Sequence, residues 1–291
     1  MGNILGGDLD QYVSNQIKIR QTSLSGNEIG VGLRAYNQNT PFIRLASSVD
    51  TGYSDGSDWF FQMVFCATTM SIVSGTLAER IKIWPFFLFA AILTGIIYPI
   101  EMGWQWGGGW LSAAGFSDFA GSTLVHAAGG AAALAGAIVL GPRLGRFSNG
   151  KLVPFASSSI PLATLGTFIL WFGWFGFNGG SQLALAGFEN ATAVATIYIN
   201  TNLAACAGVM TCAVITRLIN GKTDVIMMLN GALGGLVAIT AEPLTPTPLM
   251  AIIIGSIGGI IVILGTQALN KFQIDDVVGA IPVHLFAGIW G

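Results

Sequence analysis

The sequence predicts an all-α protein, a polytopic bundle of transmembrane helices. Hydrophobic residues make up 53% of the 291 residues and charged residues only 9%, whereas a soluble domain usually carries about 25% charged residues. Long apolar runs divide the chain, and they lack the alternation of polar and apolar residues that is typical of β-barrel strands. Composition and runs together predict helices that lie within a lipid bilayer.

These apolar runs predict seven complete spans and an eighth that the end of the chain cuts off. A helix of about 20 apolar residues crosses a hydrocarbon core of roughly 30 Å. In order, the runs are 59–78, 83–100, 119–141, 157–177, 192–216, 224–241, 247–270 and 277–291. The 40 glycines fit such a bundle, because small side chains let helices approach closely in lipid.

Basic residues predict the orientation of the spans. Lys and Arg follow the first, third, fifth and seventh runs, whereas the connections 101–118, 178–191 and 242–246 contain neither residue. Because cytoplasmic loops retain positive charge, we expect these connections outside the cell, together with an extracytoplasmic loop or flank formed by residues 1–58. A net charge of −2 offers no basic surface for nucleic acid. The expected location is the bacterial inner membrane or a plasma membrane, crossed several times.

The chain has two histidines, and each closes a nine-residue segment that begins with aspartate. DFAGSTLVH runs from Asp118 to His126 and DVVGAIPVH from Asp276 to His284, with D, G, V and H at matching places. Each histidine lies about eight residues, or roughly 12 Å, into its span. The two spans enter from opposite sides of a core of about 30 Å. The segments therefore predict an inverted internal repeat, with both histidines near the midplane.

Three roles are open to these histidines. Each could be a polar link between helices, part of a substrate or proton pathway, which is the usual role of intramembrane ionisable groups, or one axial ligand of a bis-histidine haem. The matched motifs favour the pathway. The three cysteines lack the spacing of a metal site and are expected to be small buried hydrophobes: Cys66, Cys206 and Cys212.

Five stretches together resemble the ammonium transporter family, the Amt/Mep/Rh proteins. In the family's order they are FFQMVFCATTMSIVSGTLAERI, WQWGGGWL, SDFAGSTLVHAAGGAAALAG, WFGWFGFNGGSQL and DDVVGAIPVH. The chain is similar to the third to tenth of the family's eleven helices. The resemblance implies that residues 59–291 form a partial transporter domain and that further helices flank it.

The resemblance also assigns roles to individual residues. The implied ammonium recruitment site of the outer vestibule consists of Phe61, Trp106 and Ser181. Phe65 and Phe177 correspond to the paired rings that close the pore entrance. The pore and proton relay correspond to His126 and His284, supported by Trp174, by Asp118 near the vestibule and by Asp276 on the inner side.

Most of these residues have a plain structural alternative. Trp106 could anchor the membrane interface, the phenylalanines could face lipid or core, and Ser181 could cap a helix. Asp118 could be an N-cap while also acting at the vestibule. Glu79 and Arg80 read as a solvated pair at a helix end.

Two residues near His284 depart from the family pattern. The family commonly has an aspartate at the position of Gly279, and Pro282 lies two residues before the histidine. Proline within a helix predicts a kink, which bears on where His284 lies.

The resemblance implies that ammonium is captured outside and deprotonated, and that ammonia crosses an apolar pore. Neutral ammonia has a far lower desolvation cost in a dry pore than the ion, and facing imidazoles can relay a proton. A homotrimer and a cytosolic regulatory protein of the PII type are the implied partners, with no cofactor, metal or enzymatic activity. An ammonium sensor of the same fold is the alternative function.

Overall fold

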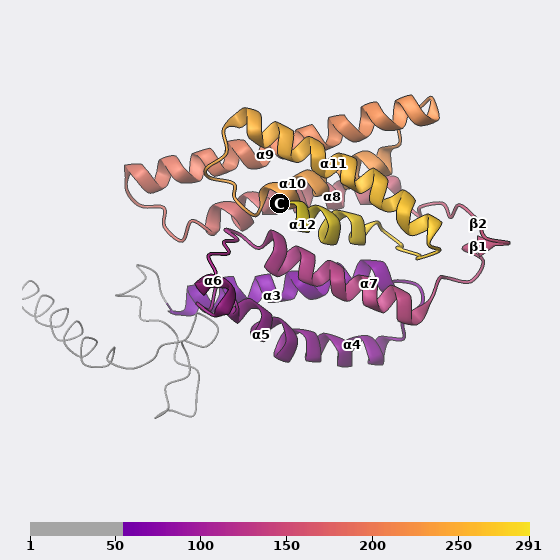
Figure 1. Ribbon diagram of the computed structural model, residues 1–291, viewed down its shortest axis with the longest axis horizontal. Coiled ribbons are helices and arrows are strands. Elements are labelled where there is room, and N and C mark those ends of the chain that lie inside the picture. Colours follow the sequence, from indigo (N-terminus) through magenta and orange to yellow (C-terminus); the bar gives the residue numbers. More distant parts are fainter. Residues whose placement is uncertain (1–54) are drawn as a thin grey trace, which may run out of the picture. The chain divides into compact units, whose positions relative to one another are not determined.

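The structure, a computed structural model, describes residues 55–291, and these residues fold almost entirely into helices (Figure 1). They group into two units, which are described separately. The smaller unit contains residues 55–62 and 100–116, and the larger one contains residues 63–99 and 117–291. The expected flank of residues 1–58 lies mostly outside the described residues and stays a prediction.

Within residues 55–291, six helical segments are long and apolar enough to cross a membrane: Gly56–Leu77, Ile83–Gly103, Ser122–Leu140, Ile160–Gly180, Phe188–Asn220 and Pro248–Lys271. Two further apolar segments are shorter, Val225–Ile239 and Ile281–Trp290. Each predicted apolar run thus corresponds to one helical segment in the described chain. The predicted all-α membrane bundle is confirmed, while its orientation stays a prediction.

Several spans combine α-helix with a π-helical turn. The elements are α3 (Asp55–Leu77), α4 (Ile83–Ile92), η1 (Leu93–Ile97), α5 (Tyr98–Gly103), α6 (Trp110–Ala113), η2 (Ser122–Ala127), α7 (Ala128–Leu140), α8 (Ile160–Gly180), α9 (Phe188–Asn220), α10 (Val225–Ile239), α11 (Pro248–Lys271), η3 (Ile281–Phe286) and α12 (Ala287–Trp290). Both histidines lie in π-helical turns, His126 in η2 and His284 in η3. Such turns occur often at functional sites.

Helix α10 is shorter than the run 224–241 predicts, and the contacts at its C-terminal end explain why. Beyond Ile239 the main chain binds another segment, since Phe119 N donates to Ala241 O at 2.7 Å and Ala120 N donates to Thr240 O at 3.1 Å. These carbonyls therefore hold the chain that leads into η2, and the apolar sequence continues past the end of the helix.

Side-chain caps fix where three helices begin. The side chains of Ser159, Asp224 and Thr247 accept hydrogen bonds from the backbone N–H three residues later, at the starts of α8, α10 and α11. Proline in the first turn of α8 and of α11 adds to this signal, because its missing N–H has no helical partner there.

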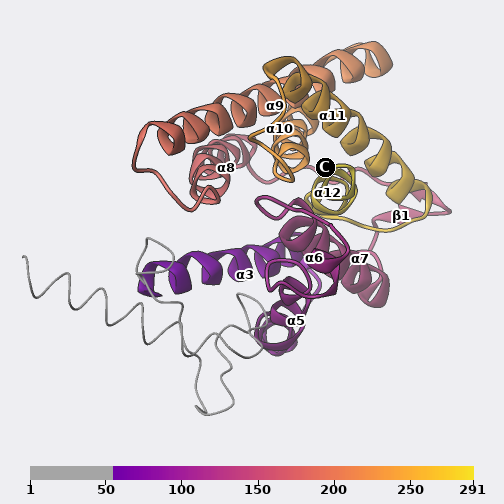
Figure 2. The same cartoon turned by 60° about the vertical axis from the view of Figure 1, so that its left-hand side comes forward.

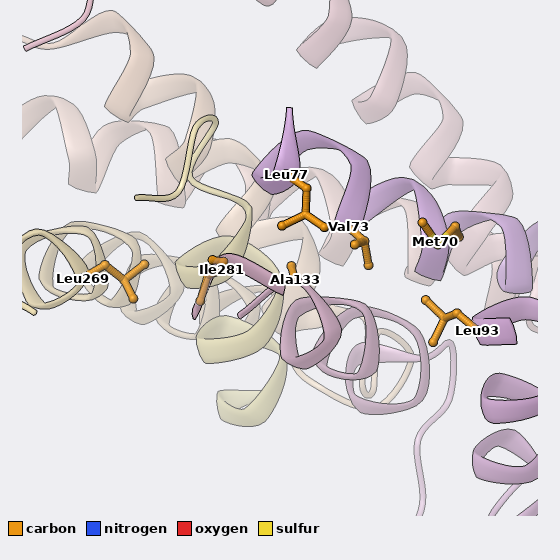
Figure 3. Packing of buried hydrophobic residues seen from close by; sticks show 8 residues of the cluster. Met70, Val73, Leu77, Leu93, Ala133, Leu269 and Ile281 are labelled. Atoms are coloured by element: carbon orange, nitrogen blue, oxygen red, sulfur yellow. The ribbon is translucent and has the colours of Figure 1, made fainter. Parts of the chain in front are cut away.

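One hydrophobic cluster joins α3, η1, α7, α11 and η3 (Figure 3). Met70, Val73 and Leu77 line one side of α3 and pack with Leu93 of η1 and Ala133 of α7. Leu269 of α11 and Ile281 of η3 complete it. The start of η3 is thereby embedded in the core.

Helices α9, α10 and α11 lie side by side and touch through glycine (Figures 1 and 2). A Cβ atom added to Gly208 of α9 would lie 2.0 Å from Gly231 O of α10, and one added to Gly258 of α11 would lie 2.6 Å from Gly234 O. Backbone therefore meets backbone, the close approach that small residues permit in lipid.

Gly208→Ala is expected to destabilise the protein by about 1 to 3 kcal/mol, because α9 and α10 must move apart to admit the methyl group. Thermal unfolding in detergent measures the effect. Gly173→Ala is the matched control, since a Cβ there meets nothing within 4 Å and alanine is the better helix former. Equal unfolding temperatures for the two variants would contradict the expectation.

A short hairpin connects α7 and α8 in the larger unit. Strands β1 (Phe147–Ser148) and β2 (Lys151–Leu152) pair antiparallel. The turn residues Asn149 and Gly150 have φ values of 51° and 75°, as the primed turn of an Asn-Gly hairpin requires.

Candidate functional site: a paired-histidine column

Asp118 organises the first repeat segment, residues 118–126. Its two carboxylate oxygens accept four backbone N–H groups, from Gly121, Ser122, Thr123 and Leu124, at 2.8 to 3.0 Å. These are the donors that a helix start leaves without partners. Gly121, at φ 97°, supplies the left-handed turn that brings all four back to one side chain. The predicted N-cap role of Asp118 is therefore present, extended to four donors.

Asp276 does the same for the second repeat segment, residues 276–284. It accepts from Gly279 N at 3.2 Å and Ile281 N at 2.7 Å, and also from the Thr76 hydroxyl of α3 at 2.9 Å. Gly279 has φ 82°, and a Cβ there would lie 2.5 Å from Nδ2 of Asn230. Glycine thus suits the position where the family commonly has aspartate. The two motifs share one local fold, as the sequence repeat predicts.

Both aspartates lie just outside the helical spans, and the same two opposing effects, burial and hydrogen bonding, determine their pKa values. Burial raises the pKa of the Asp118 carboxyl, while its backbone hydrogen bonds favour the ionised form and limit the rise. Burial likewise raises the pKa of Asp276 against the opposing bonds from Ile281 and Thr76. Each carboxyl is therefore more easily protonated than an exposed aspartate.

The two histidines meet inside the larger unit. Nδ1 of His284 lies 3.2 Å from Nδ1 of His126, with ring centroids 5.1 Å apart and an angle of 25° between the planes. His126 is 1% exposed, and its Nε2 has no hydrogen-bond partner within residues 55–291. Pro282 lies in the first turn of η3, where its missing N–H costs little, so the histidine register is kept.

Aromatic rings continue the line from His126. The ring of Phe177 stacks on His126 at 5.2 Å, and Phe65 packs against Phe177 at 4.4 Å. Trp174, one turn before Phe177 on α8, stacks on His126 at 5.0 Å with 21° between planes. The structure therefore brings together the predicted ring pair, the histidine pair and Trp174, which we call the ring column.

A buried polar chain anchors the indole of Trp174. Its Nε1–H donates to the Thr240 hydroxyl oxygen at 2.8 Å, and that hydroxyl lies 3.1 Å from Oδ1 of Asn178. Asn178 Nδ2 donates in turn to the Thr201 hydroxyl at 3.0 Å. The sequence alone did not reveal this chain, because Thr240 and Thr201 belong to other helices. The indole N–H fixes the plane of the tryptophan ring through this hydrogen bond, which a phenylalanine could not form.

Ser181 ends α8 and binds its own helix. Its hydroxyl donates to Phe177 O at 2.8 Å, so the predicted alternative of a helix-end role is observed. A hydroxyl has one proton and two lone pairs. Its oxygen can therefore still accept a hydrogen bond from a ligand.

Phe61 and Trp106 belong to the smaller unit, and both are partly buried. Trp106 follows α5 in a tight turn, where a Cβ on Gly107 would lie 2.3 Å from Gly103 O. The WGGG stretch therefore needs its glycine to fold back on α5. Trp104 and Trp110 pack at 5.8 Å and are 40% and 62% exposed, as expected of interface anchors.

The sequence did not indicate one charged cluster, which lies just after the C-terminal end of α3. Arg80 is not a solvated residue: it donates through Nη1 to the Asp275 carboxylate at 2.9 Å and through Nη2 to Asp275 O at 2.6 Å. Arg143 adds bonds from Nε at 2.8 Å and Nη2 at 3.1 Å, and Arg146 Nε lies at 3.3 Å. Glu79 pairs with Arg143 at 2.6 Å. We call the three arginines and Asp275 the arginine clamp.

Charge outweighs burial within the clamp. Burial alone would raise the pKa of Asp275, but the hydrogen bonds and charge of Arg143, with the charge of Arg80, lower it below the ordinary value. Hydrogen bonds to Asp275 raise the pKa of Arg143 against the opposing effect of burial. Asp275 is therefore a fixed anion, although its side chain has no exposed surface.

These features define a polytopic helical membrane protein with an aromatic and histidine column in its apolar interior. Residues 23–291 match the Ammonium Transporter Family. The chain belongs to this family, and the resemblance that the five motifs indicated is confirmed.

Individual relatives agree with this assignment. The chain is 47% identical over 242 residues to a putative ammonium transporter of Synechocystis sp., covering 82% of this chain and 55% of that protein. It is 49% identical over 244 residues to the ammonium transporter Amt2 of Archaeoglobus fulgidus, with 80% and 51% covered. The chain thus spans about half the length of the curated relatives that it matches.

Solved structures show the same fold. A protein described as Sensor Amt Protein superposes with a TM-score of 0.77 at 40% identity, covering 80% of this chain and 58% of that one. Mep2 of Saccharomyces cerevisiae gives 0.75 at 30% identity, covering 82% and 53%.

Proposed function

We infer that the protein moves ammonium across a membrane by capturing the ion outside, removing its proton and conducting ammonia along the ring column. Family membership supports the substrate. The observation that carries the mechanism is the contact of His126 with both His284 and Phe177. It gives a proton-exchanging pair a direct link to an aromatic gate.

The physical reason for separating proton and ammonia is desolvation. An ammonium ion inside the column would exchange water for ring faces and apolar side chains, at a cost of several kcal/mol even after relaxation. Ammonia avoids most of that cost. Imidazole nitrogens can act as both donor and acceptor, so the histidine pair suits a neutral ligand that makes hydrogen bonds.

The outer recruitment site is proposed from residue types. Aromatic faces of Phe61 and Trp106 attract cations, and the Ser181 oxygen can accept one N–H of the ion. Phe65 and Phe177 would close the entrance between this site and the histidines. Asp118 would hold the segment that carries His126.

A sensor is the second candidate function. It is favoured by the similarity to the solved structure described as Sensor Amt Protein, at 40% identity. A sensor would bind ammonium with a structural response but little flux, so flux separates the two candidates.

A bis-histidine haem is disfavoured by geometry. A haem between two axial imidazoles would separate their ligating nitrogens by the plane of the macrocycle. Here the two Nδ1 atoms lie 3.2 Å apart and face each other, and the neighbouring rings fill the space along His126.

Assembly and location are proposed together with transport. The family supports a homotrimer in the bacterial inner membrane or a plasma membrane, with a PII-type cytosolic protein as a possible regulator. Residues 1–58 and the connections 101–118, 178–191 and 242–246 would lie outside. Cross-linking of the membrane-embedded protein would test the trimer.

Uptake of labelled methylammonium by cells that lack their own ammonium transporters tests the proposal. The full-length protein should give saturable uptake that ammonium inhibits, whereas Phe177→Ala should alter it because the gate has lost one ring. Folded protein that binds ammonium but transports no more than empty membranes would favour the sensor.

A further inference from the structure

The arginine clamp touches the inner pore segment through two adjacent residues. Asp275 accepts hydrogen bonds from Arg80 and Arg143. Asp276, the next residue, accepts one from the backbone N–H of Ile281 at the start of η3. Thr76, in the last turn of α3, donates to Asp276 at 2.9 Å. Asp276 is thus held by the end of α3 and Asp275 by Arg80, in the turn that follows this helix.

The loop after α7 contributes the other half of the clamp. The Arg143 backbone N–H donates to Asp275 at 3.0 Å, in addition to its guanidinium bonds. Planar, forked contacts of this kind fix direction as well as distance. The position of Asp275 is therefore determined by two segments, the turn after α3 and the loop 141–146, before η3 begins.

The outer pore segment is held differently. There the main chain of residues 119–120 binds the main chain at the end of α10, and the Ser122 hydroxyl donates to Val237 O at 2.8 Å. Apart from the Asp118 carboxylate, hydrogen bonds to backbone carbonyls fix the segment of His126, whereas charged side chains of other segments fix the segment of His284. The two halves of the repeat therefore differ in how they are anchored.

We propose that Arg80 and Arg143 are positioning residues for the pore, which hold Asp275 so that Asp276 starts η3 in the register that places His284 against His126. The inference deepens the proposed function, since it rests on the role of the histidine pair in conduction. The arginines act through Asp275 and touch no substrate. Exchange of a clamp residue should therefore disturb the histidine contact while the hydrophobic cluster around Ile281 remains.

Nitrogen-15 NMR of histidine-labelled full chain tests the positioning directly. The wild type should show coupling through the hydrogen bond between the two Nδ1 atoms, with assignment by His284→Gln. Asp275→Asn, which keeps the side-chain shape but removes the anion, should weaken or abolish this signal. Arg217→Gln is the matched control, because within residues 55–291 the side chain of Arg217 bonds only to Gly221 O, just past the end of its own helix, and the signal should persist.

Arg80→Lys keeps the inference testable if Asp275→Asn fails to fold, because lysine retains the charge but loses the forked contact. An unchanged histidine signal in folded Asp275→Asn, or in folded Arg80→Lys where Asp275→Asn does not fold, overturns the proposal.

Transport forms the second arm. Displacement of a functional group by about 1 Å can reduce a rate roughly 100-fold. The preference for ammonium over potassium should therefore fall by about 10- to 100-fold in Asp275→Asn and stay unchanged in Arg217→Gln. An altered histidine signal in a protein whose wild type carries no ammonium would support the clamp and refute transport. An altered signal with unaltered preference in a transporting protein would overturn the link from clamp to conduction.

Discussion

His126→Ala is expected to reduce the preference for ammonium over potassium by at least about tenfold, equivalent to roughly 1.4 kcal/mol. The change removes the partner of His284 Nδ1 and opens space between Trp174 and Phe177, which now both stack on the imidazole. Water can then enter the column, and a potassium ion no longer has to shed its hydration shell. Flux of both ions into proteoliposomes measures the ratio.

The same variant should also lose some stability. Loss of one hydrogen bond that leaves a buried partner unpaired costs about 1 to 3 kcal/mol. His126→Gln is the control, since its amide can replace part of the hydrogen bonding without exchanging a proton. A His126→Ala protein with unchanged flux and unchanged preference would remove the histidine pair from the mechanism.

Asp118→Ala is expected to be the most destabilising single change in the site. Four backbone N–H groups at the start of η2 lose their acceptor together. An ordinary N-cap contributes about 0.5 to 2 kcal/mol, and buried donors left unpaired cost about 1 to 3 kcal/mol each. The expected loss therefore exceeds 2 kcal/mol and is measured by thermal unfolding in detergent.

Two variants separate the causes. Asp118→Asn retains one acceptor oxygen, so its unfolding temperature should lie between those of the wild type and Asp118→Ala. Asp224→Ala removes the cap of α10, which has one bond to Met227 N at 3.1 Å, and should cost no more than an ordinary cap. If Asp118→Ala and Asp224→Ala unfolded at the same temperature, the four hydrogen bonds of Asp118 would contribute no more stability than an ordinary N-cap.

The sequence predicts the parts of this structure that are encoded locally. Apolar runs locate the helices, and the repeated D-x-x-G motif predicts two segments that bring His126 and His284 together. The same local signals could not show that Ile239 ends α10, because that end depends on backbone bonds to Phe119 and Ala120.

Contacts between distant segments were harder to predict. Arg80 and Asp275 are 195 residues apart in sequence, and a Glu-Arg pair at a helix end has the composition of a solvated surface. Thr240, which binds the indole of Trp174, is 66 residues away from it in sequence. The available signal was a group of polar residues in apolar sequence near the paired aspartates. Only the fold shows which of these residues are in contact.

The 3.2 Å contact between the two Nδ1 atoms gives the histidine pair a direction. When both rings are neutral, each carries one ring proton, so one Nδ1 donates and the other accepts. The outer edges then differ: the ring that donates has a bare Nε2, and its partner presents an Nε2–H. A proton that passes along the pair reverses this polarity. The tautomers of the two rings therefore depend on the last proton transfer until a further rearrangement restores the original ones.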